Sequence, residues 1–464
     1  MKSVLLLCIA ALVAGGCTTR GGDRGVTGDA STADGSTGDA TTPPPPTPRV
    51  PPASISGTVW APGNAPGMVP VGHEIPVSGA IVRLTTTAPE AIPGNAYCER
   101  CVDVSGVHAV AESDGTFTIN GILPGDYWLS VQKGQFRIDT QVTLAEAEDR
   151  TIPDARSTLP SNNDPSSGRW VPRIAVASGT FDDIQDVLGK MSIGTVDASG
   201  NYEMTDSSAS IDFYSNGGTE FSRMSGSLTD LVSDLDRMSQ YHIIFIPCAG
   251  SANTDALEDQ QNLRNIRDYV AMGGKLYVTD WSGEWMDNVF PSQITLQDEN
   301  HDTPAAAYNA EANTWNTALF GDANGSLYSS NNAEVTDENL FDWLNGQTGP
   351  SADDPDSIIT FDASHFDVVD NWNTIVATTP TQVGFDEEGL PLIDSPKAYV
   401  IGGHGTETPK LPLTVTFEPA GCGRVLYSTY HTTDEPHAGL VPQERILLYL
   451  IMEIGVCIEA PILI

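Results

Sequence analysis

YHIIFIPCAGSANTDALEDQQNLRNIRDYVAMGGKLYVTD (241–280) alternates between a strand, a helix and a second strand. Its apolar run HIIFIP (242–247) is typical of a strand that is buried on both faces of a sheet. The segment 257–272 predicts a helix that two glycines end, and KLYVTD (275–280) is the next strand. Strands that alternate with helices along the chain indicate an α/β fold with a doubly wound, mostly parallel sheet.

The same alternation extends over 171–464, which we predict to be one α/β domain. Residues 291–390 interrupt it with a stretch rich in Asn, Asp and Thr, and we expect an insertion there over one end of the sheet. Further strands are expected at 173–177, 397–403, 413–417 and 423–431, and further helices at 181–191, 227–238 and 443–454.

Residues 53–155 have a different pattern, in which short runs alternate apolar and polar residues. Asp114-Gly115 and Pro124-Gly125 mark tight turns between these runs. The pattern predicts a small antiparallel β-sandwich, followed by a linker at 156–170. Its strands are expected at 55–60, 79–84, 107–112, 115–121 and 127–132.

This sandwich region resembles the carboxypeptidase regulatory-like domain, which has a transthyretin-like, carbohydrate-binding-like fold. The resemblance rests on ISGTV (55–59), PVSGAIVRL (76–84), DGTF (114–117) and LPGDYWLSV (123–131). It implies a structural or carbohydrate-binding module without catalytic residues.

Near its start the chain has a positive residue, Lys2, followed by a ten-residue apolar run, 4–13. This run is too short to span a membrane as a helix. It suits a signal peptide over 1–16. Ala14-Gly15-Gly16-Cys17 resembles the lipobox of bacterial lipoproteins, with Ala14 in place of the usual Leu. The resemblance implies a lipid on Cys17 and transport to the outer membrane. An ordinary signal peptide with a chance cysteine is the alternative.

Residues 17–52 consist mainly of Gly, Ser, Thr, Asp and Pro. They have too little apolar surface to bury, so we expect a disordered tether. The whole chain has 61 Asp and Glu against 22 Lys and Arg, a formal net charge of −39. This balance disfavours nucleic acid, whose phosphates require clustered cations.

The α/β region resembles the class I glutamine amidotransferase-like superfamily, which has a flavodoxin-like fold. The resemblance rests on YHIIFIPCAG (241–250), YVAMGGKLYVTDW (269–281) and GCGRVLYSTYH (421–431). It implies a nucleophilic cysteine on a G-x-C-x-G elbow. Cys248 lacks that elbow, because Ile246 stands at the position of its first glycine. We therefore expect a degenerate, inactive relative.

Five cysteines remain in the mature chain after the anchor, in an oxidising setting. Cys98 and Cys101 share one loop, and we expect a local disulfide, because a lone CxxC is a poor zinc or thioredoxin signal. Cys422 and Cys457 are expected at one edge of the sheet and form our second predicted disulfide. Cys248 is then unpaired.

Cys248, Asp280 and His431 each follow a predicted parallel strand, and ligands bind where such strands end. A thiol, a carboxylate and an imidazole at one edge suit a nucleophile, an orienting group and a base. The structural alternative is a buried thiol, a helix-capping Asp and a packed His. Trp281 and Trp285 lie four residues apart on a predicted helix, where they either stack on a sugar or cover the core.

We therefore predict a non-enzymatic lipoprotein, held in the outer membrane by its N-terminal lipid, that faces the periplasm or the cell surface. Its role is binding or scaffolding, and its partner is a polysaccharide or a cell-envelope protein. We expect no cofactor and no metal. The alternative is a hydrolase that uses Cys248 and His431.

Overall fold

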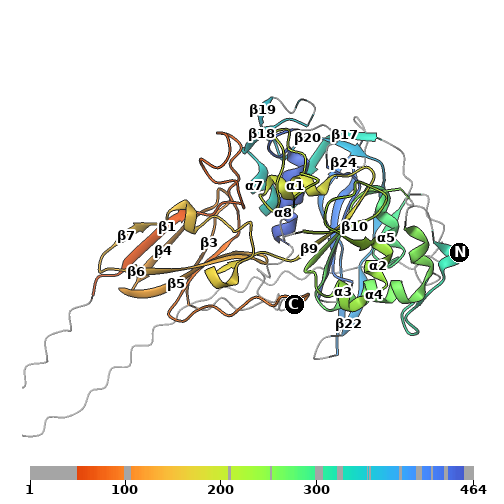
Figure 1. The fold of residues 1–464 in the computed structure, drawn as a ribbon, viewed down its shortest axis with the longest axis horizontal. Coiled ribbons are helices and arrows are strands. Elements are labelled where there is room, and N and C mark those ends of the chain that lie inside the picture. Colours follow the sequence, from red (N-terminus) through yellow and green to blue (C-terminus); the bar gives the residue numbers. More distant parts are fainter. Residues whose placement is uncertain are drawn as a thin grey trace, which may run out of the picture. The chain divides into compact units, whose positions relative to one another are not determined.

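The computed structural model describes residues 50–98, 106–206, 211–250, 253–297, 307–320, 328–352, 354, 357–385, 389–403, 410–419, 422–432 and 437–453. They all belong to one compact unit, residues 50–464. The expected signal peptide, the tether as far as residue 49, and Cys17 lie outside the described residues. Element labels are those of Figure 1.

The first part of this unit contains two small β-sheets, in the strand orders β4-β1-β7 and β3-β2-β5-β6-β8 (Figure 1). All neighbouring strands are antiparallel except β1 and β7. The strands are β1 (Ala53–Thr58), β2 (Ile81–Thr85), β3 (Val107–Val110), β4 (Thr116–Ile122), β5 (Gly125–Lys133), β6 (Phe136–Leu144), β7 (Asp149–Thr151) and β8 (Arg169–Trp170).

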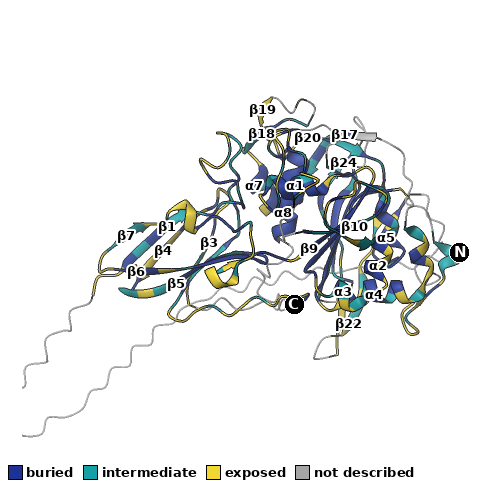
Figure 2. Cartoon of the chain, viewed as in Figure 1, coloured by how far each residue is buried: buried dark blue, intermediate teal, exposed yellow. Residues whose placement is uncertain are grey.

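Alternation of apolar and polar residues produces this β-rich region, as the sequence predicts. In β4, Phe117, Ile119 and Ile122 are buried, while the polar residues between them are exposed (Figure 2). Gly115 has a left-handed φ of 76°, and an added Cβ would lie 2.7 Å from Val59 O, so this turn requires glycine. Strand β8 comes from the expected linker and pairs with β6.

The second part is built on a ten-stranded sheet in the order β11-β10-β9-β12-β13-β26-β25-β24-β17-β20. The first six strands in this order are parallel to one another, and the remaining neighbouring pairs are antiparallel. The strands are β9 (Ile174–Ser178), β10 (Ile211–Ser215), β11 (Met224–Ser227), β12 (Ile243–Ile246), β13 (Lys275–Thr279), β17 (Tyr328–Val335), β20 (Phe366–Asn371), β24 (Lys397–Gly402), β25 (Leu411–Phe417) and β26 (Arg424–Ser428).

The sheet is therefore mixed, whereas the sequence predicts a mostly parallel one. Only residues 418–423 connect β25 to β26, and a parallel crossover needs about a dozen residues or more. Strands β17 and β20 come from the expected insertion, 291–390, and extend the antiparallel half of the sheet.

Small two-stranded sheets are formed by β14 (Ile294–Leu296) with β21 (Ile375–Thr378), β15 (Tyr308–Asn309) with β16 (Thr314–Trp315), β18 (Thr348–Pro350) with β19 (Ile358–Thr360), and β22 (Thr381–Phe385) with β23 (Pro391–Asp394).

Helices lie on the two sides of the parallel strands (Figure 1). Alternate residues of β12 enter different hydrophobic clusters: Ile243 and Phe245 pack in the cluster that contains residues of α1 and α8, and Ile244 and Ile246 in the cluster of α2, α4 and α5. The helices are α1 (Ile184–Lys190), α2 (Leu228–Val232), α3 (Leu235–Met238), α4 (Gln260–Ala271), α5 (Glu284–Asp287), α7 (Glu338–Leu344) and α8 (Pro442–Glu453), with short 3₁₀ turns η1 (Asp154–Arg156), η2 (Pro165–Ser167), η3 (Thr254–Glu258), η4 (Asp280–Gly283) and η5 (Thr317–Leu319).

Several hydrogen bonds join the first β-rich part to the ten-stranded sheet region. Trp343 Nε1 donates to Pro76 O over 2.7 Å, and Thr348 Oγ1 donates to Gly72 O over 3.0 Å. One hydrophobic cluster also includes residues of both regions. The two regions therefore share part of their core.

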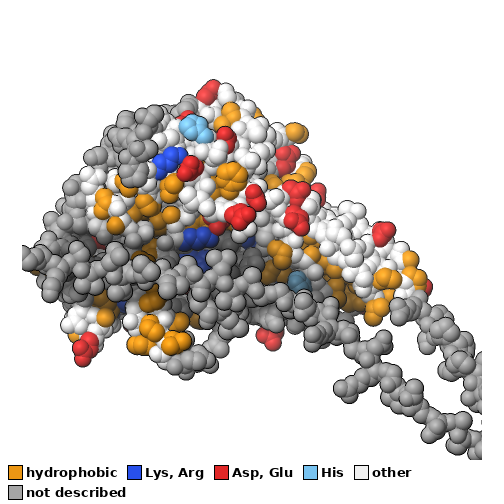
Figure 3. All heavy atoms as spheres, turned by 180° about the vertical axis from the view of Figure 1, so that it is seen from behind, with side chains coloured by type: hydrophobic (Ala, Val, Ile, Leu, Met, Phe, Trp, Pro, Cys, Tyr) orange, Lys and Arg blue, Asp and Glu red, His pale blue; other side chains and the backbone are white. Residues whose placement is uncertain are grey.

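Figure 3 shows one face of the molecule, on which Asp and Glu side chains are scattered among hydrophobic and other residues and outnumber Lys and Arg. Within the described residues, every helix is too short or too polar to span a membrane.

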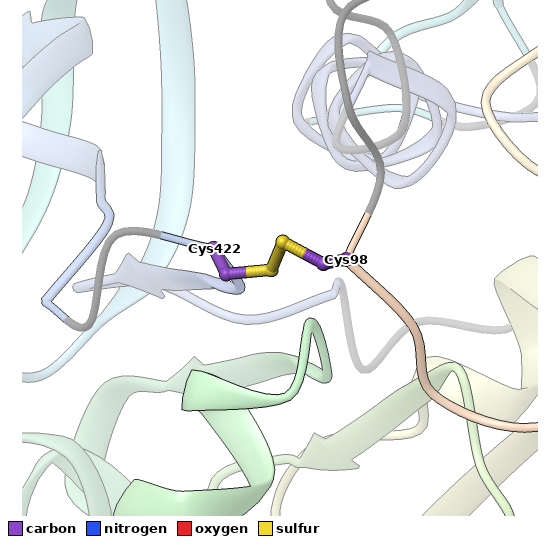
Figure 4. Close-up of a disulfide and its surroundings, with 2 residues drawn as sticks. All are labelled: Cys98 and Cys422. Carbon is purple, nitrogen blue, oxygen red and sulfur yellow. A yellow bond between two sulfur atoms is a disulfide. The ribbon is translucent and has the colours of Figure 1, made fainter. Parts of the chain in front are cut away.

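The disulfide that the structure contains differs from both predicted pairs: Cys98 is bonded to Cys422, with 5.4 Å between their Cα atoms (Figure 4). The loop before Cys98 follows the sheet edge, where Ala96 N–H donates to Ser239 O over 2.8 Å and His242 Nε2 donates to Pro93 O over 2.8 Å. These contacts place Cys98 next to Cys422, which lies just before β26.

The predicted partners, Cys101 and Cys457, lie outside the described residues. Cys248 is free and buried, as expected.

A digest of the non-reduced protein is expected to contain a Cys98–Cys422 linked peptide. Replacing both cysteines by Ser is expected to lower the free energy of unfolding by about 2–5 kcal/mol, because the bond constrains the unfolded chain. Peptide mapping by mass spectrometry and urea unfolding measure the two effects. A map that links Cys98 to Cys101 instead would contradict this pairing.

Candidate functional site at the ends of the parallel strands

Three neighbouring parallel strands, β12, β13 and β26, bring three reactive side chains together. The chain reaches Cys248, Asp280 and His431 just after these strands end. One ring nitrogen, the thiol sulfur and one carboxylate oxygen all lie within 4.8 Å of one another. Their exposed fractions are only 1, 0 and 3 %. We call these three residues the thiol–carboxylate–imidazole cluster.

The imidazole of His431 has a fixed orientation within this cluster. Its Nδ1 lies 2.8 Å from Thr432 O. A carbonyl oxygen only accepts hydrogen bonds, so Nδ1 carries the proton in the neutral ring. Nε2 is then the nitrogen with the lone pair, and it lies 3.8 Å from Asp280 Oδ2.

Asp280 occupies an unusual position for a buried carboxylate. It follows β13 directly and has a left-handed φ of 47°, which few residues other than glycine adopt. Neither carboxylate oxygen accepts a hydrogen bond from the described residues. The nearby Trp372 N–H donates to Thr429 O over 3.3 Å, and its proximity to Asp280 opposes the rise in the pKa of this carboxyl group. Burial, followed by the charge of Asp182, raises the pKa of Asp280 well above its usual value.

Asp182 is a member of this region that the sequence analysis missed. It is 1 % exposed and accepts hydrogen bonds from Thr279 Oγ1 (2.6 Å) and from Thr432 N (3.1 Å) and Oγ1 (2.6 Å). Thr279 Oγ1 also accepts from Cys248 N over 2.8 Å. Asp182 thus links the ends of β12, β13 and β26 by hydrogen bonds, directly to Thr279 and Thr432 and through Thr279 to Cys248. The sequence feature that could have indicated Asp182 is the Asp pair in FDD (181–183), just before α1.

The environment of Cys248 disfavours a thiolate. Burial and the neighbouring Asp280 carboxylate raise the pKa of the Cys248 thiol, against a smaller opposing effect of the Trp281 N–H. The left-handed turn of the site is at Asp280, and Cys248 does not have such a turn. Burial of the thiol and the position of the left-handed turn thus both differ from what a nucleophilic cysteine on an elbow requires.

The two tryptophans predicted as ligand-binding residues have different environments. Trp285 is 1 % exposed and belongs to the hydrophobic core, which agrees with the core-covering alternative for this residue and removes it as a ligand-binding candidate. Trp281 is half-buried and contacts Phe181 and Trp372 edge-on, with ring centroids 5.6 and 5.3 Å apart. Trp281 Nε1 donates to Trp372 O over 3.2 Å. We call Phe181, Trp281 and Trp372 the aromatic cluster.

A second buried imidazole and carboxylate provide a comparison for the site. His437 Nε2 lies 2.9 Å from Glu444 Oε2, and Lys190 Nζ lies 3.4 Å from Glu444 Oε1. Burial alone would raise the pKa of Glu444, but the Lys190 cation and His437 together lower it. Within the described residues, no Lys or Arg forms an ion pair of this kind with Asp280.

Two hollows of the surface lie elsewhere. One of about 560 Å³ is lined by residues that include Arg267 and Tyr308, and one of about 260 Å³ by residues that include Trp170 and His242. Neither is lined by a member of the thiol–carboxylate–imidazole cluster.

Comparisons with known proteins leave the family open. No family model matches the chain, and no curated protein does. Among solved structures, the chain is similar to the minor pilin GBS52 of Streptococcus agalactiae, at 17% identity and a TM-score of 0.15, over 22% of this chain and 42% of the pilin. It is also similar to a cohesin–X-dockerin complex of Acetivibrio cellulolyticus, at 18% identity and a TM-score of 0.15, over 33% of this chain and 81% of that one. The matched part thus spans about two fifths of the pilin.

Asp186 on α1 is expected to make stability depend on pH. Burial raises its pKa from 3.8 to about 7, although Tyr202 N–H donates to Oδ1 over 2.8 Å. A pKa raised in the folded state stabilises the protein below the unfolded pKa, and this contribution is lost as the pH rises through about 7. Asp186→Asn is therefore expected to reduce the fall in the free energy of unfolding between about pH 5 and about pH 8, by about 1–3 kcal/mol in urea titrations.

Asp197→Asn is the matched control for this measurement. A hydrogen bond from Asn201 lowers the pKa of Asp197, so this carboxylate stays ionised over the tested range. An equal fall for wild type and Asp186→Asn would contradict the assignment.

Proposed function

We propose that this chain is a non-catalytic lipoprotein of the bacterial outer membrane that binds polysaccharide, and that the aromatic cluster is its binding site. The observation that carries the proposal is the position of this cluster beside the ends of the parallel strands. Phe181 is 43 % exposed, and Trp281 and Trp372 are half-buried. Ligands of open α/β sheets bind outside the carboxyl ends of the strands.

The chemistry of the aromatic cluster suits a sugar. A pyranose ring presents C–H groups on its faces, which pack on aromatic rings, and hydroxyl groups at its edge. Phe181 and Trp281 are perpendicular, with 88° between their planes, so they form a corner rather than a flat platform. Such a corner would contact one face and one edge of a sugar unit.

The proposal that the chain lies in the cell envelope is supported by its sequence. The lipobox-like segment that ends at Cys17 provides an anchor, and residues 17–52 provide a tether. The sandwich resembles a carboxypeptidase regulatory-like domain, a type of module that accompanies secreted proteins. The larger region has helices on both sides of its parallel strands, which supports a doubly wound fold. Its sequence resemblance supports a degenerate relative of the class I glutamine amidotransferases.

The role of Trp281 can be tested with a glycan array and the full-length protein. Wild type is expected to retain a polysaccharide on the array. Trp281→Ala is expected to weaken binding to that polysaccharide by at least about tenfold, or about 1.4 kcal/mol, because a ring that contacts the sugar is lost. Isothermal titration calorimetry measures the difference.

Trp128→Ala is the matched control, because Trp128 is a half-buried tryptophan in β5 of the sandwich region. The proposal fails if wild type retains no glycan, or if the control weakens binding as much as Trp281→Ala does.

A second candidate function is a hydrolase with Cys248 as nucleophile and His431 as base. The distances within the thiol–carboxylate–imidazole cluster favour it, because all three reactive atoms lie within 4.8 Å. The burial of Cys248 and the raised pKa of its thiol oppose it. We therefore place it second.

Iodoacetamide labelling separates the two candidates. Because only a thiolate reacts quickly, native Cys248 is expected to react at least about 100-fold more slowly at neutral pH than in the unfolded protein. The labelled residue is identified by mass spectrometry. Rapid and complete alkylation of native Cys248 would favour the hydrolase.

A further inference from the structure

We propose that Cys248, Asp280 and His431 bind a zinc ion through the Cys248 sulfur, one Asp280 oxygen and His431 Nε2. The sequence analysis predicted no metal here. This inference goes beyond the proposed polysaccharide binding and does not depend on it.

The three side chains are the ligand types that zinc prefers, and their spacing is close to that of a zinc site. Bonds of about 2.0–2.3 Å in a tetrahedron place the ligand atoms about 3.3–3.8 Å apart. The Asp280 Oδ2 to His431 Nε2 distance is already 3.8 Å. All pairs lie within 4.8 Å, so closing the site requires side-chain shifts of about 1 Å or less.

The tautomer of His431 is the one that a metal ligand requires. Its Nδ1–H donates to Thr432 O, so the Nε2 lone pair points to the side where Asp280 lies. Metal-binding histidines usually donate their second ring N–H to a carbonyl or a carboxylate in this way.

The charges in the site call for a cation. An ionised Asp280 and the lone pair of a neutral Nε2 repel each other at 3.8 Å unless a proton or a metal ion lies between them, and Asp182 adds a second buried carboxylate. The Asp280 oxygens accept no hydrogen bond from the described residues. The other buried pair, His437 and Glu444, has Lys190 as its cation. A zinc ion would supply the missing charge for Asp280, and would also stabilise the thiolate of Cys248.

Three protein ligands leave one coordination position open. Asp182 is not the fourth ligand in this arrangement, because its oxygens already accept from Thr279 and Thr432. Water would take the fourth position. A proton on Asp280 or on His431 Nε2 is the competing way to offset the buried charge, and zinc analysis distinguishes it from a metal.

The test measures zinc in the full-length protein after removal of metal with a chelator, addition of Zn²⁺ and gel filtration. Inductively coupled plasma mass spectrometry is expected to find one zinc per chain. Cys248→Ser, Asp280→Asn and His431→Gln are each expected to weaken zinc binding by at least about tenfold. Circular dichroism shows whether each variant is folded.

His242→Gln is the matched control. His242 is also buried, but Arg173 N–H donates to its Nδ1 over 2.8 Å and its Nε2 donates to Pro93 O over 2.8 Å. Both ring nitrogens are thus occupied, and this variant is expected to retain one zinc.

Cobalt replacement gives a readout that a merely structural effect would not produce. Co²⁺ bound by a thiolate has a sulfur-to-metal charge-transfer band in addition to its visible bands. Wild type is expected to show that band, and folded Cys248→Ser is expected to lose it. A wild type that binds no stoichiometric zinc would overturn the proposal in favour of a proton on Asp280 or on His431. Equal zinc retention by all three variants, or equal loss by His242→Gln, would also overturn it.

Discussion

Burial of the parallel strands on both faces is the constraint on which the rest of the structure depends. Every residue of β9, β12 and β13 is buried, and their alternate side chains enter two separate hydrophobic clusters. Burial of each large apolar side chain stabilises the fold by about 1.5–3 kcal/mol, so exposing either face of the sheet to water would be strongly destabilising. Polar chemistry is therefore confined to the ends of the strands, where Cys248, Asp280 and His431 meet.

The sequence predicted the parts of the fold that local patterns determine. The strands before Cys248 and Asp280 and the helices α1, α4 and α8 lie within a few residues of the expected ranges, because buried strands and amphipathic helices have distinct periods. The antiparallel half of the sheet was not predicted, since the pairing of β17 and β20 depends on contacts far apart in the chain. The Cys98–Cys422 bond joins residues 324 positions apart, and no local pattern signals such a pair.

The candidate site was predictable only in part, for the same reason. The rule that parallel strands end at one edge is enough to group Cys248, Asp280 and His431. It says nothing of burial, which raises the pKa of the Cys248 thiol and makes Trp285 a core residue. Asp182 reaches the site from before α1, and only its hydrogen bonds with Thr279 and Thr432 reveal it. The absence of a Lys or Arg ion pair at Asp280, within the described residues, likewise required the structure.

These observations separate two kinds of chemistry at one end of the sheet. The aromatic cluster is partly exposed and suits a ligand from outside, whereas the thiol–carboxylate–imidazole cluster is closed and suits an ion. X-ray absorption spectroscopy of the zinc-loaded full-length protein tests the second assignment most directly. The account predicts one sulfur at about 2.3 Å and nitrogen or oxygen ligands at about 2.0–2.1 Å from zinc. A first shell that contains only oxygen and nitrogen would contradict it.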